Sequence, residues 1–114
     1  MIFTHRDGIS PIQMEAKMVE GKRLYSTPYG NNYPSITTVI SNNAAKKAGI
    51  AKWRARIGST KADAICKRST TRGTTYHSIV EDYFNNRLDI DSYKESPLPV
   101  VMFQHSKHVL DRIN

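Results

Sequence analysis

A chain of 114 residues with a single cysteine and a formal net charge of +7 is long enough for one small domain and too short for two independent ones. The lone Cys66 excludes an internal disulfide framework, and the sequence has no apolar run long enough to cross a membrane. We therefore expect a protein of a reducing compartment, without a membrane partner, whose basic charge favours a polyanionic one.

The N-terminal segment, residues 1 to 34, is expected to contain a small β-hairpin. Residues 1 to 21 show no clear period, whereas the following stretch GKRLYSTPYGNNYPS alternates and then turns. Tyr25 and Tyr33 flank a Pro, a Gly and two Asn residues, which supply the φ angles that a tight turn requires. Two short strands are expected around that turn.

Two helices are predicted next, each with a recognisable cap. Ser35 can cap a helix that runs to about Ser41, because apolar residues recur there at helical spacing. Asn42 and Asn43 interrupt that pattern and can cap a second helix over residues 44 to 57, amphipathic and basic on one side. Gly58 ends it by lowering the cost of a left-handed backbone.

The remaining sequence predicts further helix. Ser59 or Thr60 caps a third helix that reaches Thr71 or continues beyond it, and Gly73 either punctuates that helix or lies within it at a close packing point. From Thr74 to Phe84 the apolar residues follow a strong 3.6-residue period. Residues 88 to 99 have the composition of a loop, and a last helix is expected over residues 100 to 113.

These elements predict a mostly α fold with a small N-terminal β-hairpin. Residues 1 to 114 are interpreted as a single domain or part of one, in which residues 35 to 114 form the helical portion. The content of Leu, Ile, Val and Phe is low for a well-filled core, which favours an incomplete domain.

Basic residues are concentrated between Ala44 and Arg72, where only one acid, Asp63, occurs. Such a run indicates either nucleic-acid binding or a solvated helix face. Trp53 lies within the run and has two interpretations: it can stack an unpaired base, or it can belong to the core, as tryptophans more often do. The basic residues are Lys46, Lys47, Lys52, Arg54, Arg56, Lys61, Lys67, Arg68 and Arg72.

His77 and Glu81 are four residues apart, so on a helix they project from one face about one turn from each other. An imidazole nitrogen and a carboxylate oxygen suit Mg²⁺ or Mn²⁺ only when further oxygen ligands join them. On spacing alone, an exposed His and Glu pair on a helix surface is the favoured interpretation. Two residues cannot fix a metal ion by themselves.

A zinc site is the weaker of the metal hypotheses. His105 and His108 have H-x-x-H spacing, but Cys66 is the one cysteine available to join them, so solvated helix histidines are favoured. Cys66 has no paired His that would activate it as a nucleophile. We expect it to be a small buried hydrophobic residue.

The order of the motifs resembles that of a known family. The segments YPSITTVIS, AKWRARIG, RGTTYHSIVEDYF and PVVMFQHSKHVLDRIN follow one another over residues 33 to 114. In this order they resemble the PD-(D/E)XK nucleases of the RecB-like branch, a family that includes phage exonucleases and the mitochondrial genome maintenance exonuclease. The most specific part is the RG(T) element followed by a His and by an acid four residues later.

The resemblance implies a metal-dependent DNA exonuclease that acts on single-stranded ends and uses Mg²⁺ or Mn²⁺ without a small-molecule cofactor. His77 would be a metal ligand, and Glu81 would support the metal or its water. It implies a cytoplasmic location in a bacterial or phage-infected cell and a role in DNA replication or repair. The expected nucleic-acid contacts, from the motifs and the basic run together, are Ser35, Thr37, Thr38, Lys52, Trp53, Arg54, Arg56, Arg72 and Thr74.

The sequence also departs from the family pattern. The metal-binding Asp and the (D/E)xK motif, which a β-hairpin carries in the family, have no counterpart here, and Asp89 and Asp91 lie in an expected loop. The chain therefore corresponds to the N-terminal helical part of the α/β nuclease fold, with the central sheet largely missing, and we expect it to be inactive alone. The alternatives are a nucleic-acid-binding protein without catalysis and a fragment that interacts with a protein partner.

Overall fold

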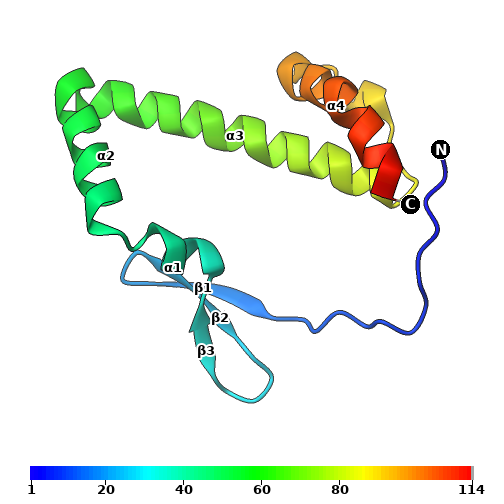
Figure 1. Cartoon of the computed structure of the whole chain (residues 1–114), viewed down its shortest axis with the longest axis horizontal. Coiled ribbons are helices and arrows are strands. Elements are labelled where there is room, and N and C mark those ends of the chain that lie inside the picture. The colour runs from blue at the N-terminus through cyan, green and yellow to red at the C-terminus, as the bar shows by residue number, and fades with distance from the viewer. Residues whose placement is uncertain (114) are drawn as a thin grey trace. The chain divides into compact units, whose positions relative to one another are not determined.

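The computed structural model describes residues 1–113 and divides the chain into two compact units. Unit 1 comprises Met1–Asp7 and Thr60–Asn114, and unit 2 comprises Gly8–Ser59. Figure 1 follows the chain from the three strands through α1 and α2 to the long helix α3 and the last helix α4. Each unit is described by itself below.

Unit 2 begins with a three-stranded antiparallel sheet in the order β1-β2-β3. Strand β2 (Lys22–Ser26) pairs with β3 (Asn32–Pro34), which places Tyr25 opposite Tyr33 and confirms the predicted hairpin. Strand β1 (Glu15–Val19) pairs with the other edge of β2. Strand β1 was not predicted, and all five of its residues are exposed.

The two helices of unit 2 begin and end where their caps predict. In α1 (Ile36–Ser41), the Ser35 side chain accepts a hydrogen bond from the Thr38 amide. In α2 (Ala44–Ile57), Asn43 caps the start in the same way, and Gly58 follows the end with φ +91°. A backbone with positive φ strains most side chains and costs glycine little, so Gly58 stops α2.

Residues 59 to 84 form one helix, α3 (Ser59–Phe84), which is 26 residues long. Gly73 therefore lies within the helix, and its missing side chain faces open space instead of a close packing partner. Asn86, with φ +58°, follows the end of the helix. Among residues 1–113, no helix is long and apolar enough to cross a membrane, and α3 is long but mostly polar.

The segment after α3 is more ordered than its composition predicts. It contains a 3-10 turn, η1 (Ile90–Tyr93), and α4 (Pro97–Leu110) begins earlier than the expected residue 100. Prolines 97 and 99 fit the first turn, because the N–H groups at those positions have no partner within the helix. A second 3-10 turn, η2 (Asp111–Ile113), follows α4.

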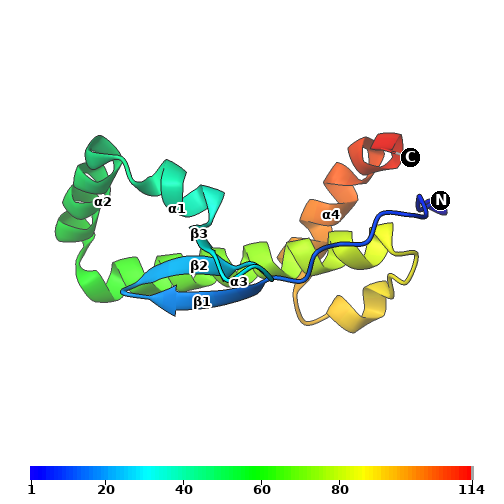
Figure 2. The ribbon, with the colours of Figure 1, turned by 90° about the horizontal axis from the view of Figure 1, so that it is seen from below.

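The core of unit 1 forms where α4 lies across the second half of α3 (Figures 1 and 2). Its buried residues are Phe3, Ile79, Tyr83 and Phe103. The Tyr83 ring packs edge-on against both Phe3 and Phe103, with 5.0 Å between ring centroids in each pair. Helix α3 thus contributes a stripe of side chains at helical spacing, as its period predicts.

The N-terminal residues belong to this core. Phe3 is 7% exposed. The Asn86 side chain forms hydrogen bonds with both the N–H and the carbonyl group of Phe3. The Phe3 N–H donates to Asn86 Oδ1 at 2.7 Å, and Asn86 Nδ2 donates to the Phe3 carbonyl at 2.9 Å. His5 Nε2 also lies 2.8 Å from the Phe84 carbonyl oxygen. These contacts fix residues 3 to 5 against the end of α3.

The architecture confirms a mostly α chain with a small N-terminal β-hairpin. The helix α2 differs from the prediction in one respect, because its apolar residues do not gather on one face and none of them is buried. None of residues 8–59, all of which the structure describes, is buried. Unit 2 is therefore held mainly by backbone pairing and helix caps.

Candidate functional site

His77 and Glu81 lie on one open face of α3, as their spacing predicts. They line a hollow of about 470 Å³ whose wall is formed by successive turns of the helix. Both side chains are exposed, and Gly73 leaves the space between turns open. The hollow is lined by Thr70, Gly73, Thr74, His77, Ser78 and Glu81.

The Glu81 carboxylate lies near the guanidinium of Arg87. Arg87 Nη2 lies 3.6 Å from Glu81 Oε1, and the two side chains are 61% and 69% exposed. An ion pair this exposed contributes little to stability, because water screens it. Glu81 is therefore free to exchange Arg87 for another cation.

Arg87 makes its closer contact to Asp82, in a network that includes Tyr93. Arg87 Nε donates to Asp82 Oδ1 at 2.8 Å, and the Tyr93 hydroxyl donates to Asp82 Oδ2 at 2.6 Å. The hydrogen bond from Tyr93, followed by that from Arg87, holds the pKa of Asp82 below its ordinary value. The same hydrogen bond to Asp82 raises the pKa of Tyr93.

A second network of the same kind ties α3 to the end of α4. The Tyr83 hydroxyl donates to Asp111, and Lys107 Nζ donates to the other carboxylate oxygen of Asp111 at 2.9 Å. These bonds, that from Tyr83 first, lower the pKa of Asp111. The hydrogen bond to Asp111 is the main cause of the raised pKa of Lys107.

The stability of unit 1 should therefore fall at low pH. A carboxylate whose pKa is lowered by folding stabilises the fold above its unfolded pKa, about 3.8 for Asp, and that stabilisation is lost as pH falls through the lower folded value. Thermal unfolding between about pH 5 and 2 should show a falling Tm, and Asp82→Asn should flatten the profile. Glu95→Gln, which changes an exposed acid outside both networks, should leave the profile unchanged.

The donor set at His77 and Glu81 consists of two side chains. Among residues 1–113, no group of three or more His, Cys, Asp or Glu side chains could bind one. The pair offers one imidazole and one carboxylate, whereas Mg²⁺ requires about six ligands in octahedral geometry. The pair can thus contribute at most part of a coordination sphere.

The other candidate ligands lie apart. His105 and His108 are exposed on α4, and Cys66 is exposed on α3, so the expectation of a buried Cys66 is wrong. Its neighbour Ile65 is exposed as well, at 36%.

Arg72 and Thr74 lie on different sides of α3. Thr74 lines the hollow of His77 and Glu81, whereas Arg72 lines a second hollow of about 520 Å³ beside the start of α4. Arg72 and His77 are five residues apart, which separates them by about 140° around the helix axis. The structure therefore does not bring Arg72 together with the His77 and Glu81 pair.

The hydroxyl residues at the start of α1 are engaged with one another. Ser35 Oγ lies 3.0 Å from Thr37 Oγ1 and 2.8 Å from Thr38 Oγ1, and it also caps the helix. Ser35 thus has a structural role, while Thr37 is exposed and Thr38 is half-buried.

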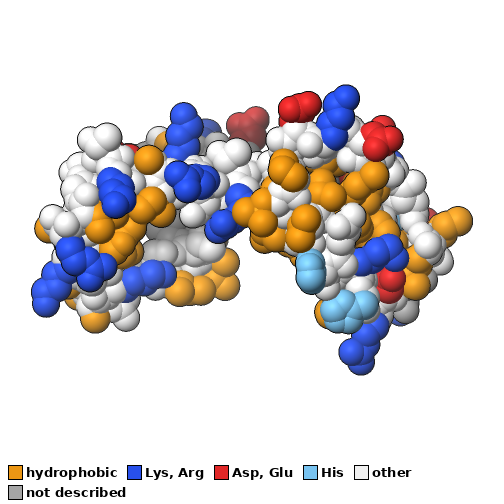
Figure 3. Space-filling view, turned by 90° about the horizontal axis from the view of Figure 1, so that it is seen from above, with side chains coloured by type: hydrophobic (Ala, Val, Ile, Leu, Met, Phe, Trp, Pro, Cys, Tyr) orange, Lys and Arg blue, Asp and Glu red, His pale blue; other side chains and the backbone are white. Residues whose placement is uncertain are grey.

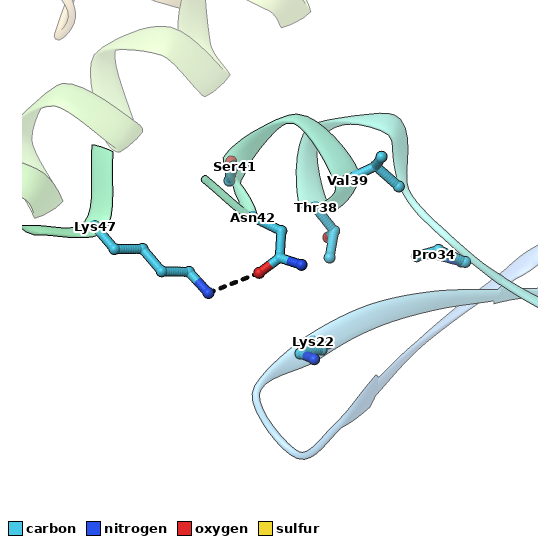
Figure 4. A pocket seen from close by; sticks show the side chains of 7 residues that line it. All are labelled: Lys22, Pro34, Thr38, Val39, Ser41, Asn42 and Lys47. Carbon is cyan, nitrogen blue, oxygen red and sulfur yellow. Dashed lines mark hydrogen bonds between the residues drawn. The ribbon is translucent and has the colours of Figure 1, made fainter. Parts of the chain in front are cut away.

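Thr38 lines a hollow of about 340 Å³ within unit 2. Figure 4 shows Lys47 reaching from α2 towards α1, where its Nζ donates to Asn42 Oδ1 at 2.8 Å. No local pattern predicts this hollow, because four elements, β2, β3, α1 and α2, contribute to it. It is lined by Lys22, Pro34, Thr38, Val39, Ser41, Asn42 and Lys47.

The basic run lies on exposed helix surface. Trp53 and Arg54 are half-buried, whereas Lys52 and Arg56 are exposed and lie one turn apart on α2. The expectation of a core tryptophan is not met, because no residue of unit 2 is buried. A half-buried indole keeps part of its ring accessible to a ligand.

Charge is unequally divided between the two units. Residues 8–59 contain eight Lys and Arg against two Asp and Glu, so unit 2 carries +6 of the net +7. Figure 3 shows Lys and Arg side chains over the whole visible surface, whereas the acids are few and lie mostly near one another. The positive potential of the molecule therefore arises mainly from unit 2 and, through Lys61, Lys67, Arg68 and Arg72, from the first half of α3.

Comparison with known proteins adds no relative. No protein-family model, curated protein or solved structure matches the chain. The resemblance to RecB-like nucleases therefore depends on the order and spacing of the motifs themselves.

Proposed function

We propose that the chain is the DNA-binding, helix-rich part of a metal-dependent DNA exonuclease that acts on single-stranded ends. The observation that supports this best is the set of basic side chains on α2 and the first half of α3. They are exposed and, among the described residues, form no ion pair with an acid. The set comprises Lys46, Lys52, Arg56, Lys61, Lys67, Arg68 and Arg72.

Binding would follow from charge and stacking together. Exposed Lys and Arg side chains neutralise phosphates and release the counterions condensed on the strand, which makes affinity fall as salt rises. Trp53, half-buried between Lys52 and Arg54, would offer its ring to an unpaired base. Unpaired bases present a flat face to such a ring, which favours single strands over duplex.

His77 and Glu81 would be two of the ligands of Mg²⁺ or Mn²⁺ in the nuclease centre. The metal would supply charge for the attack of water on a phosphodiester. Because the described residues provide only two donors, the remaining ligands must come from outside them. We therefore expect DNA binding without cleavage from residues 1–113.

Trp53 provides a direct test of DNA binding, since it is the only tryptophan of the chain. Titration with an oligothymidylate of about 15 nucleotides, within the site sizes of single-strand binders, should quench its fluorescence to saturation. The midpoint should shift to higher DNA concentration as salt rises. Absence of quenching and of any change in oligonucleotide anisotropy would falsify the proposal.

A binding protein without catalysis is the second candidate, and the lack of a three-donor group among the described residues favours it. The effect of Mn²⁺ on DNA affinity distinguishes the two candidate functions. If His77 and Glu81 contribute to a metal centre on the DNA, Mn²⁺ should tighten binding by the wild type, and His77→Ala with Glu81→Gln should abolish that effect. Equal tightening, or none, in both proteins would favour the binding protein.

A further inference from the structure

The hollow beside the start of α4 has an apolar floor and a basic rim. Helix α3 forms one wall, from Ala64 to Thr75, and the first turn of α4 forms the other. Its volume is about 520 Å³, within the usual range for ligand sites. The lining residues are Ala64, Lys67, Arg68, Thr71, Arg72, Thr75, Ser96, Pro97, Leu98 and Pro99.

The floor is rigid and offers few polar groups. Prolines 97 and 99 have a fixed φ and no N–H, and Leu98 between them is 52% exposed. Ser96 precedes the helix without making a side-chain cap hydrogen bond. A flat apolar group would bury the exposed part of Leu98 here.

The rim consists of cations that have no partner. Lys67, Arg68 and Arg72 are exposed, form no ion pair among the described residues, and face no acid in the hollow. Arg68 and Arg72 lie one turn apart, about 6 Å along the axis of α3. The hollow therefore suits a ligand that carries both a flat apolar group and negative charge.

The cations continue beyond the hollow along the same side of α3. Lys61, Arg68 and Arg72 fall within about 40° of one another around the helix axis. A row of this kind matches a ligand whose charges repeat, as phosphates do along a nucleic-acid strand. Only an unpaired base could leave that backbone to enter the hollow, where it would stack on a guanidinium or on Leu98.

We propose that this hollow holds an unpaired base of single-stranded DNA, with its neighbouring phosphates at Lys67, Arg68 and Arg72. The inference rests on the proposed DNA binding and adds a second contact region to it. Since Arg72 and the His77 and Glu81 pair lie on different sides of α3, a base held here is separate from the proposed metal ligands. The role of the hollow would be to hold the DNA strand on the protein.

The test compares two variants of α4 on two oligonucleotides. Leu98→Asn makes the floor polar, and Val101→Asn makes the same kind of change at a site on α4 that is 44% exposed and outside the hollow. The probes are fluorescent oligothymidylate and an abasic strand with the same phosphates, measured by anisotropy with the full chain. Circular dichroism verifies that both variants keep their helices.

Leu98→Asn should weaken oligothymidylate binding by about fivefold or more, because the base would lose the apolar surface that it covers, and it should leave abasic binding unchanged. Val101→Asn should alter neither. Arg68→Gln with Arg72→Gln should weaken both strands and make the salt dependence shallower. These results together would support the base site.

Several outcomes would overturn it. Unchanged oligothymidylate binding by Leu98→Asn, or equal losses on both strands, would show that no base enters the hollow. Oligoglutamate of equal charge that competes as well as oligothymidylate would show that the rim recognises charge alone. If the wild type binds neither strand, the proposed function itself fails, a result distinct from the preceding ones.

Discussion

Phe103→Ala is expected to lower the free energy of unfolding of unit 1 by about 3–5 kcal/mol, the usual cost of removing a buried phenyl ring. Phe103 is 4% exposed and packs against Tyr83, which in turn packs against Phe3. The core cluster has four buried members among the described residues, so few side chains remain to close around the cavity. A loss of this size approaches the whole stability of a small domain.

Urea unfolding followed by near-ultraviolet circular dichroism of the tyrosines would measure the effect. Val109→Ala is the matched control, since Val109 lies on the same helix and is 51% exposed. It should change the midpoint little. Similar losses for the two variants would contradict a core centred on Phe103.

Lys52→Gln with Arg56→Gln is expected to weaken binding to single-stranded DNA by roughly 10- to 30-fold at about 0.1 M salt. The two side chains are exposed and lie one turn apart on α2 beside Trp53. Each lost phosphate contact should reduce the slope of log K against log salt by about 0.7, so the double variant should lose about 1.4. Anisotropy titrations over a range of salt concentrations would measure both quantities.

Lys94→Gln with Arg112→Gln removes the same charge from exposed positions of unit 1. If binding depends on the α2 surface, this control should keep nearly the wild-type affinity and slope. An equal loss would mean that total charge governs binding, and the interface on α2 would then be wrong.

Local signals were sufficient to predict most helices. The bounds of α2 agree with the prediction at both ends, because Asn43 and Gly58 act through the backbone of their own neighbours. Strand β1 was missed since its signal lies in its pairing with β2, and its residues are exposed. Whether Gly73 interrupts α3 was left open, because an isolated glycine is tolerated within a helix.

The site was predictable only where it depends on one helix. The spacing of His77 and Glu81 placed them on one face, as the structure shows. Arg72 was expected to contact phosphate because it belongs to the RG(T) element, yet the helix turns it towards α4 and away from the pair. The hollow at Leu98 depends on how α4 packs on α3, and its residues had the composition of a loop, so the sequence contained no local sign of it.

The N-terminal contacts of unit 1 also determine how the chain is threaded. Phe3 and Asn86 are joined by hydrogen bonds across 83 positions of sequence, and the whole of unit 2 lies between them. Unit 2 is thus an insertion within a discontinuous unit 1. During synthesis Phe3 leaves the ribosome before α4 does. The core that contains Phe3 can therefore form only after α4 has been synthesised. Closure of so long a loop costs entropy before it gains contacts, so we expect the core of unit 1 to form in a late, slow folding phase.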